Sequence, residues 1–260
     1  MEAFKGLLQK EIKLTKNWFL TGIALQIIAY LTGIGLAGYF NEPIIPMIMS
    51  YVVFFIHAFY LPAYLLTSLN IEGQTQLWLH NPNSGTKLLL AKLAAGFVFF
   101  LISILFSMLV TKWQLLFSIQ SDHFIRFTGG FVPNLLLTSA GIASFSIYLG
   151  IWVLFYWSLY HSLKSVPVLK KFRWPILIII WNVLQIIGTS LEKLPLYKKI
   201  INIGVIHLNQ KNPMQFNAGN SSIGFHDVTK IPTMSLLIFA GIAIIVFYIA
   251  VWLLERKVEV

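Results

Sequence analysis

The stretch Asn17-WFLTGIALQIIAYLTGIGLAGYF-Asn41 contains no Asp, Glu, Lys or Arg. An α-helix rises ~1.5 Å per residue and the hydrocarbon core of a bilayer is ~30 Å thick, so one crossing needs about 20 mostly apolar residues. A charged side chain at the centre of the bilayer costs roughly 2.5 to 3.5 kcal/mol on insertion scales. The stretch therefore predicts a membrane-spanning helix.

Five more stretches share this absence of charge: Pro43–Ile71, Leu93–Thr111, Phe127–Leu163, Trp174–Leu191 and Ile231–Leu254. The composition agrees, because 57% of the residues are hydrophobic and 11% are charged, against about 25% charged residues in soluble proteins. We therefore expect one domain of residues 1–260, an all-α integral membrane protein with six transmembrane helices. Their predicted ranges are 18–40, 44–67, 91–111, 132–160, 174–191 and 233–254.

The distribution of positive charge predicts the orientation. If the N-terminus is cytoplasmic, the inner segments 1–17, 68–92, 161–173 and 255–260 carry 12 of the 19 Lys and Arg residues. Five of the remaining seven lie in the long segment 192–233, and long segments obey the positive-inside rule poorly. We expect an N-in/C-in topology. The net charge of +10 then reflects topology and contact with anionic membrane lipid, and no nucleic acid is expected as a partner.

Two segments outside the predicted spans are amphipathic or apolar. Within residues 1–17, apolar side chains share one helical face and lysines lie mostly on others, which predicts an interfacial helix; an unstructured basic tail is the alternative. The predicted extracellular segment 192–232 contains an apolar run from Ile200 to Leu208. This run favours a short interfacial or re-entrant helix between the fifth and sixth spans over a loose loop.

Polar groups inside two predicted spans have two interpretations each. His57 lies deep in the second span, near Pro62. Pro62 should bend that helix and free a backbone carbonyl, which protein, water or a neighbouring hydroxyl such as that of Tyr60 or Tyr64 must cover. His57 either hydrogen-bonds an adjacent helix or contacts a substrate or proton. In the fifth span, the i, i+3, i+7 spacing puts three side chains on one polar face: Asn182, Gln185 and Thr189. This face serves hydrogen bonding between helices, or it faces a substrate or another subunit.

Several kinds of chemistry have no sequence support. The chain has no GxxxxGK[ST] phosphate loop, no HExxH zinc pair and no cysteine, and its predicted spans hold no paired carboxylates. We expect neither an enzyme nor a bound metal or cofactor. An ion-coupled carrier usually needs a buried carboxylate, and the predicted spans offer none. A transporter with this sequence would therefore be passive or would take energy from a partner.

The loop between the second and third predicted spans carries the clearest motif. Glu72 and Gly73 stand where the chain leaves the membrane, and Pro82 precedes a helix that restarts towards Lys92. Between them lies an apolar cluster of Leu77, Trp78 and Leu79. Such a cluster outside the membrane favours docking on a partner surface; lying flat on the bilayer is the alternative.

This loop resembles the corresponding segment of the six-helix permease subunits of type-2 (ABC-2 type) ABC exporters. The matching positions are Glu72, Gly73, Thr75, Leu77, Leu79, Pro82, Ser84 and Ala91-Lys92. The resemblance implies a cytoplasmic coupling helix near residues 70–85, with Glu72, Gly73, Leu77, Trp78, Leu79 and Pro82 as the residues that couple to a cytosolic ABC ATPase. It also implies a basal N-terminal helix, a second permease copy or a sister permease, and location in the bacterial cytoplasmic membrane.

In such exporters the second and fifth helices flank a central pathway, which makes His57, Asn182, Gln185 and Thr189 the candidate pathway residues. The resemblance thus predicts the membrane-spanning subunit of an ATP-driven exporter that works by alternating access. An amphiphilic substrate, such as an antimicrobial peptide, a lipid-like molecule or a drug, fits chains of this type. A membrane immunity factor that sequesters a toxin without transport is the alternative.

Overall fold

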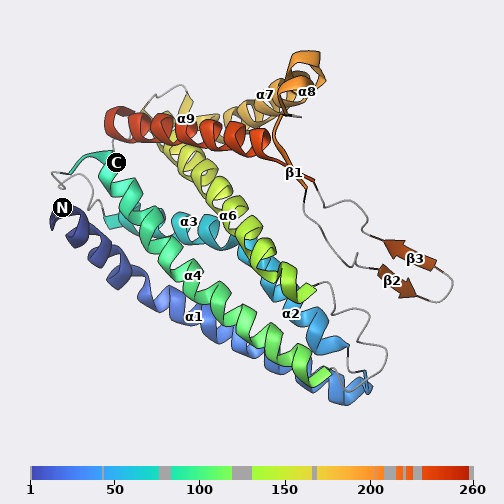
Figure 1. Ribbon diagram of the computed structural model, residues 1–260. Helices are drawn as coiled ribbons and strands as arrows, with labels where there is room; N and C mark the ends of the chain where they lie inside the picture. The colour runs from blue at the N-terminus through green and yellow to red at the C-terminus, as the bar shows by residue number, and fades with distance from the viewer. Residues whose placement is uncertain are drawn as a thin grey trace.

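The computed structural model describes residues 2–42, 44–75, 83–118, 131–165, 169–201, 203–207, 215–218, 221–224 and 230–257. Its elements in chain order are α1 (Glu2–Phe40), α2 (Ile45–Ile56), η1 (His57–Phe59), α3 (Tyr60–Thr75), α4 (Gly85–Ser118), α6 (Phe131–Ser162), η2 (Leu163–Ser165), η3 (Leu169–Lys171), α7 (Arg173–Lys193), α8 (Pro195–Ile201), β1 (Val205–His207), β2 (Gln215–Ala218), β3 (Ser221–Gly224), β4 (Lys230–Pro232) and α9 (Thr233–Lys257). Helices dominate the fold, and the strands are confined to the region between α8 and α9 (Figure 1).

Six helical segments are long and apolar enough to cross a membrane, as the sequence predicts. They are Glu2–Phe40, Ile45–Gly73, Gly85–Gln114, Leu135–Ser162, Arg173–Lys193 and Thr233–Arg256. The fourth is a single long helix, in agreement with the interpretation of its charge-free stretch as one crossing. The chain therefore has the helices of a multi-pass membrane protein.

The predicted N-terminal helix is helical from Glu2 and continues without a break into the first span. Its place at the membrane interface stays a prediction. Residues 2–40 form one continuous helix, because no Gly or Pro interrupts it between Gly6 and Gly22. Its N-terminal part is also drawn into the bundle, since Leu7, Glu11 and Thr15 are buried at i, i+4 and i+8. These three residues share a helical face, so the beginning of α1 packs against protein along that face.

The second span bends where its sequence predicts. A 3₁₀ turn, His57–Phe59, separates α2 from α3, because Pro62 has no N–H for the usual helical bond and its ring crowds the preceding turn. The backbone N–H of Leu61 donates to Ser146 Oγ of α6 at 3.2 Å. The neighbouring hydroxyl at the bend is therefore Ser146, and it accepts from an N–H, whereas the prediction concerned a freed carbonyl. The Tyr64 hydroxyl lies 3.0 Å from Thr15 Oγ1 instead.

Five of the six spans form the bundle, and α7 lies at its edge. α6 packs along α9 and α3, while α1 packs along α2 and α4. The core between them includes Tyr64, Phe100 and Leu154, all fully buried. α7 contacts the bundle mainly through α6, and no residue of α7 is buried. Figure 1 shows α7 and α8 on the side away from α1 and α2.

The region between α8 and α9 differs in part from the predicted helix over Ile200 to Leu208. Helix α8 ends at Ile201. Gly204 follows with a φ of +72°, a backbone conformation that residues with a side chain rarely adopt. Val205–His207 then pairs antiparallel with Lys230–Pro232, and Gln215–Ala218 pairs antiparallel with Ser221–Gly224. The β-branched Val205 and Ile206 favour this strand over a longer helix. Re-entry of this segment into the membrane stays a prediction.

Candidate functional site

The strongest polar cluster lies at the end of the bundle where α1 begins and α9 ends, here called the terminal end (Figure 1). Its members are Glu11 of α1, Ser68 and Glu72 of α3, and Lys92 of α4, and each is at most 2% exposed. We call these four residues the charge cluster. Glu72 lies in the last turn of α3 and Lys92 in the second turn of α4, so the cluster joins both flanks of the predicted coupling segment to α1.

Lys92 is the centre of this cluster. Its Nζ lies 3.0 Å from each carboxylate oxygen of Glu11 and 2.8 Å from Glu72 Oε2. It also donates to Ser68 Oγ at 2.8 Å, and that hydroxyl donates to Glu11 Oε2 at 2.8 Å. Lys10, which is partly exposed, forms an ion pair with Glu72 Oε1. Every charged group of the cluster therefore has a partner of opposite charge.

The charge cluster is electrically balanced when Lys10 is counted with it. Glu11 and Glu72 carry two negative charges, and Lys10 and Lys92 carry two positive charges. A buried ion pair gives little net stability compared with apolar packing, but removal of one partner leaves an uncompensated charge and typically costs about 3 to 5 kcal/mol. The ion pairs thus fix α1, α3 and α4 relative to one another.

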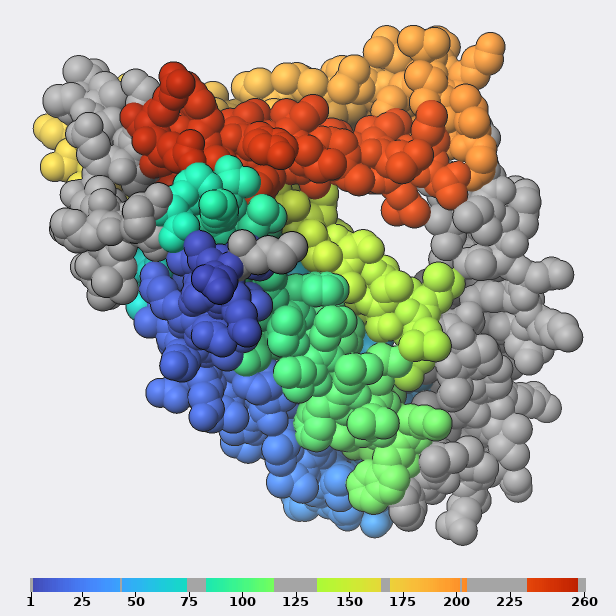
Figure 2. All heavy atoms as spheres, turned by 60° about the vertical axis from the view of Figure 1, so that its left-hand side comes forward, coloured from blue at the N-terminus to red at the C-terminus, as the bar shows by residue number. Residues whose placement is uncertain are grey.

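Two further contacts fix the flanks of the predicted coupling segment. Before the segment, Trp157 Nε1 of α6 donates to Asn70 Oδ1 at 2.9 Å. After it, the backbone N–H of Gly85 donates to Glu255 Oε1 of α9 at 2.7 Å. Figure 2 shows the end of α9 lying over the beginning of α4 at this place. Residues from α6, α9, α1 and α4 therefore converge on the two flanks.

Close packing explains why glycines stand at these flanks. A Cβ atom on Gly73 would lie 3.3 Å from Cζ2 of Trp157, and a Cβ on Gly85 would lie 2.8 Å from Cγ of Glu255. Both approaches are closer than ordinary van der Waals contact. A side chain at position 85 would therefore displace the Glu255 side chain, and one at position 73 would press on the Trp157 ring.

The structure places the predicted coupling residues differently from one another. Glu72 is not a surface charge available for docking, because it is buried between Lys10 and Lys92. Gly73 packs against Trp157. Leu77, Trp78, Leu79 and Pro82 lie outside the described residues, so their docking role stays a prediction.

His57 lies in a second polar cluster inside the bundle. It is 3% exposed, its Nδ1 lies 2.8 Å from the carbonyl oxygen of Val53, and its Nε2 lies 3.0 Å from Ser103 Oγ. Because a carbonyl only accepts, Nδ1 carries the hydrogen, and a neutral ring then accepts from Ser103 at Nε2. Gln26 of α1 in turn donates to Ser103 Oγ. This is the geometry of a hydrogen-bonded histidine between helices, and its pathway role stays a prediction.

The polar face of the fifth span has no such partners among the described residues. Asn182, Gln185 and Thr189 are all exposed. Asn182 Nδ2 donates to the carbonyl oxygen of Ile178 at 2.8 Å, and Thr189 Oγ1 donates to that of Gln185 at 3.0 Å. Both bonds stay within α7. Hydrogen bonding to another helix of the same chain therefore does not explain the face, which is open to lipid, a substrate or another subunit.

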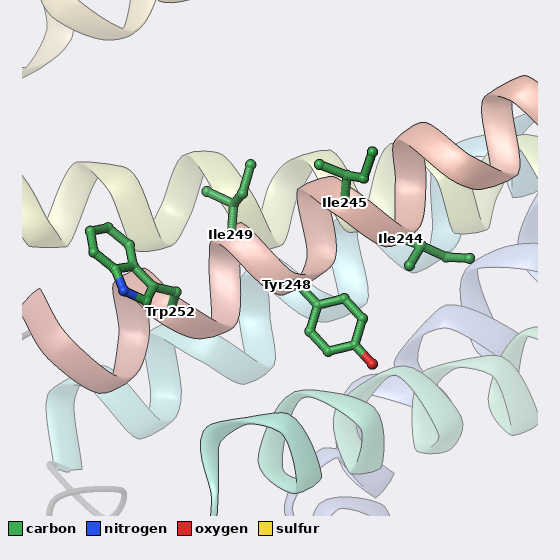
Figure 3. Close-up of a pocket in the computed structure, with 5 residues that line it drawn as sticks. All are labelled: Ile244, Ile245, Tyr248, Ile249 and Trp252. Atoms are coloured by element: carbon green, nitrogen blue, oxygen red, sulfur yellow. The ribbon is translucent and has the colours of Figure 1, made fainter.

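A shallow apolar hollow of about 380 Å³ lies along one face of α9 (Figure 3). Its lining residues all come from this helix: Ile244, Ile245, Tyr248, Ile249 and Trp252. Ligand sites usually enclose a molecule and bring several polar groups together, whereas this surface is apolar and lies on a single helix. It suits contact with lipid chains.

Sequence reasoning missed most of the charge cluster. The signal for Glu11 was its position four residues after Leu7 and four before Thr15, on the face that α1 buries. Lys92 was noted only as the end of the helix restart. The sequence interpretation that the spans offer no buried carboxylate was wrong, because Glu11 and Glu72 lie in helices that continue beyond the charge-free stretches. Within the described chain, no group of three His, Asp or Glu residues could hold a metal ion.

Taken together, the chain is helical and has six helices long and apolar enough to cross a membrane, as in a multi-pass membrane protein. No family model and no solved structure matches the chain. It is 30% identical over 183 residues to the "Uncharacterized protein YhcE" of Bacillus subtilis (strain 168), a match that spans 69% of this chain and 70% of the relative. The chain belongs to the family of that protein.

Proposed function

We propose that this chain is the permease subunit of an ATP-driven exporter of the ABC-2 type. In this proposal the terminal end faces the cytoplasm of a bacterial cell and residues 70–85 dock on a cytosolic ABC ATPase. A second permease copy or a sister permease completes the pathway. The chain itself would neither bind nor hydrolyse ATP.

One observation supports this proposal above the others: the fixing of both flanks of the predicted coupling segment. Glu72 and Lys92, on either side of it, share the charge cluster with Glu11, and Gly85 is bonded to α9. A segment that is to transmit force needs rigid attachment to the helices that it moves. Buried ion pairs and close helix contacts supply that attachment, whereas a segment that merely lies on the membrane needs none.

The proposed cycle follows from these attachments. ATP closes the ATPase dimer, the two coupling segments move with it, and α1, α3 and α4 follow as one body because the charge cluster joins them. The 3₁₀ turn at His57–Phe59 is the natural pivot between this body and α2. An amphiphilic substrate, such as an antimicrobial peptide, a lipid-like molecule or a drug, would cross along polar groups such as those of α7.

The first test is the partner. The tagged full chain is purified from native membranes in mild detergent, and co-purified proteins are identified by mass spectrometry. We expect an ABC ATPase in stoichiometric amount. Trp78→Ala should remove an aromatic anchor worth about 2 kcal/mol or more, so binding weakens by roughly thirtyfold. Trp174→Ala is the control, because it removes an exposed indole elsewhere in the chain.

The second test separates docking from transmission. Glu72→Gln keeps the shape of a buried side chain but removes its charge, so the complex should form while stimulation of ATP hydrolysis by the permease falls. A chain that never co-purifies with an ATPase, and whose Trp78→Ala variant keeps full activity, would support the sequestration factor instead.

Orientation has its own test, helped by the absence of native cysteine. An impermeant thiol reagent added to intact cells should label Ser222→Cys and spare Ser165→Cys. The reverse pattern would place the terminal end outside the cell and rule out a cytosolic ATPase at the coupling segment.

A further inference from the structure

Four cations gather at the junction of α6 and α7 without acidic partners. Lys164 lies in η2, Lys170 and Lys171 lie in η3, and Arg173 begins α7. The sequence has no Asp or Glu between Asp122 and Glu192, and none of the four cations forms an ion pair with any described residue. We call these four residues the basic rim. Its local charge of +4 is uncompensated within the described chain.

The contrast with other lysines at the terminal end is informative. Lys10 and Lys92 are both neutralised by carboxylates of the charge cluster. The three lysines of the basic rim are instead exposed. The fold therefore pairs the buried Lys92 and the partly exposed Lys10 with carboxylates, and leaves the basic rim available to an anion from outside.

The start of α7 contacts both η3 and the end of α6. The Arg173 Nε–H donates to the carbonyl oxygen of Lys170 at 3.0 Å, and the guanidinium carbon lies 4.6 Å from the centre of the Tyr160 ring. Tyr160 also contacts Trp174, with ring centres 5.5 Å apart. These contacts tie the start of α7 to the end of α6, so the cations stay together at the point where two membrane-length helices meet.

Aromatic side chains indicate that the basic rim lies at the level of the lipid headgroups. Phe172 is 57% exposed and Trp174 is 67% exposed, next to Arg173 on either side. Trp and Tyr are enriched at the level of the lipid headgroups, where one side of the ring is apolar and the other is wet. A surface for an acidic soluble protein would not need these rings at the ends of two apolar spans.

We propose that the basic rim binds the headgroup phosphate of an anionic phospholipid. The lysines supply the charge, Arg173 supplies a preoriented guanidinium that suits a phosphate group, and Phe172 and Trp174 contact the upper part of the acyl chains. Clusters of Lys and Arg beside a membrane helix attract anionic lipid in this way. The inference does not depend on export, because it rests only on the α6–α7 junction.

The test measures lipid retention by native mass spectrometry of the full chain, purified in neutral detergent and supplied with phosphatidylglycerol or phosphatidylcholine. The variant is the triple substitution Lys164→Gln, Lys170→Gln and Lys171→Gln. The matched control is Lys193→Gln, Lys198→Gln and Lys199→Gln, three exposed lysines at and beyond the other end of α7. We expect phosphatidylglycerol affinity to fall about tenfold or more in the first variant only. Replacement of the same three lysines by Arg should restore it.

Several results would overturn this proposal. Equal losses in both triple variants would show a general charge effect, and an unchanged affinity in the first would show that the rim does not bind lipid. Displacement of phosphatidylglycerol by millimolar inorganic phosphate would reduce the rim to a simple anion site. Loss of a co-purified acidic protein, with lipid retention unchanged, would assign the rim to a protein partner. Should the triple variant fail to fold, Lys170→Gln and Lys171→Gln alone provide the same comparison with a smaller effect.

Discussion

The charge cluster and the polar face of α7 both place hydrogen-bonding side chains on apolar helices, but among the described residues only the charge cluster has its partners on other helices. Glu11, Glu72 and Lys92 come from three helices and satisfy one another. Asn182 and Thr189 come from one helix and bond only to its own backbone. The first arrangement holds this chain together, whereas the second contributes little to it and is free to serve contacts outside it.

The bundle and α7 also differ in how much of each helix is buried. Spans that carry buried polar residues, such as α1 with Glu11 and Thr15 and α4 with Ser103, each pack along two or more other spans. α7 has no buried residue. Because lipid offers no hydrophobic force between helices, small residues and hydrogen bonds decide which helices associate. Substitutions in the bundle should therefore affect stability, and substitutions in α7 should affect function.

The largest effect is expected from Lys92→Met. This change leaves Glu11 and Glu72 close together and buried without their shared cation, which should destabilise the protein by about 3 to 5 kcal/mol. The measurement is thermal unfolding in detergent, with the amount of protein in the membrane as a second readout. Lys87→Met, an exposed position on the same helix, should change stability by less than about 0.5 kcal/mol.

A second change distinguishes charge imbalance from loss of packing. Adding Glu11→Gln to Lys92→Met removes one of the two unbalanced carboxylates, while Lys10 still pairs with Glu72. Stability should recover in part. If Lys92→Met alone matches the Lys87→Met control, the cluster does not hold the helices in register, and the transmission argument loses its basis.

A smaller effect is expected from Gly96→Ala in α4. An added Cβ would lie 2.5 Å from Cδ1 of Tyr64, a fully buried ring whose hydroxyl is 3.0 Å from Thr15 Oγ1. The ring cannot move without disturbing that bond, so we expect a loss of about 1 to 3 kcal/mol in the free energy of unfolding.

Gly188→Ala in α7 is the matched control, because nothing lies within 4 Å of its Cβ position. Alanine favours a helix over glycine by up to about 1 kcal/mol, so this variant should be neutral or more stable. A similar loss in both would mean that α7 is as tightly packed as the bundle.

The six spans could be predicted from the sequence because the free-energy cost of placing a charge in the membrane applies to each helix separately. The six apolar segments and the bend near Pro62 follow from such local rules. Contacts between helices obey no local rule. Glu11 and Lys92 are 81 residues apart, and nothing in the surroundings of either residue points to the other. For the same reason, Ser146 could not be identified as the acceptor of the Leu61 N–H; the expectation concerned a freed carbonyl and the hydroxyls of Tyr60 and Tyr64.

The smallest effect on stability is expected from Asn182→Leu combined with Gln185→Leu. The double variant removes the bond from Asn182 to the backbone of its own helix and no contact with another described element, so unfolding should shift by less than about 0.5 kcal/mol. If α7 faces a substrate or a second subunit, transport or resistance should fall while protein level and ATPase binding stay normal.

Ile187→Leu, at an exposed apolar position of the same helix, should leave all four measurements unchanged. A double variant that keeps full transport would show that this polar face contacts only lipid, and a variant that is lost from the membrane would show that α7 is held by contacts like those of the bundle. Either result would remove the distinction between the two regions, since that distinction requires function to change while stability does not.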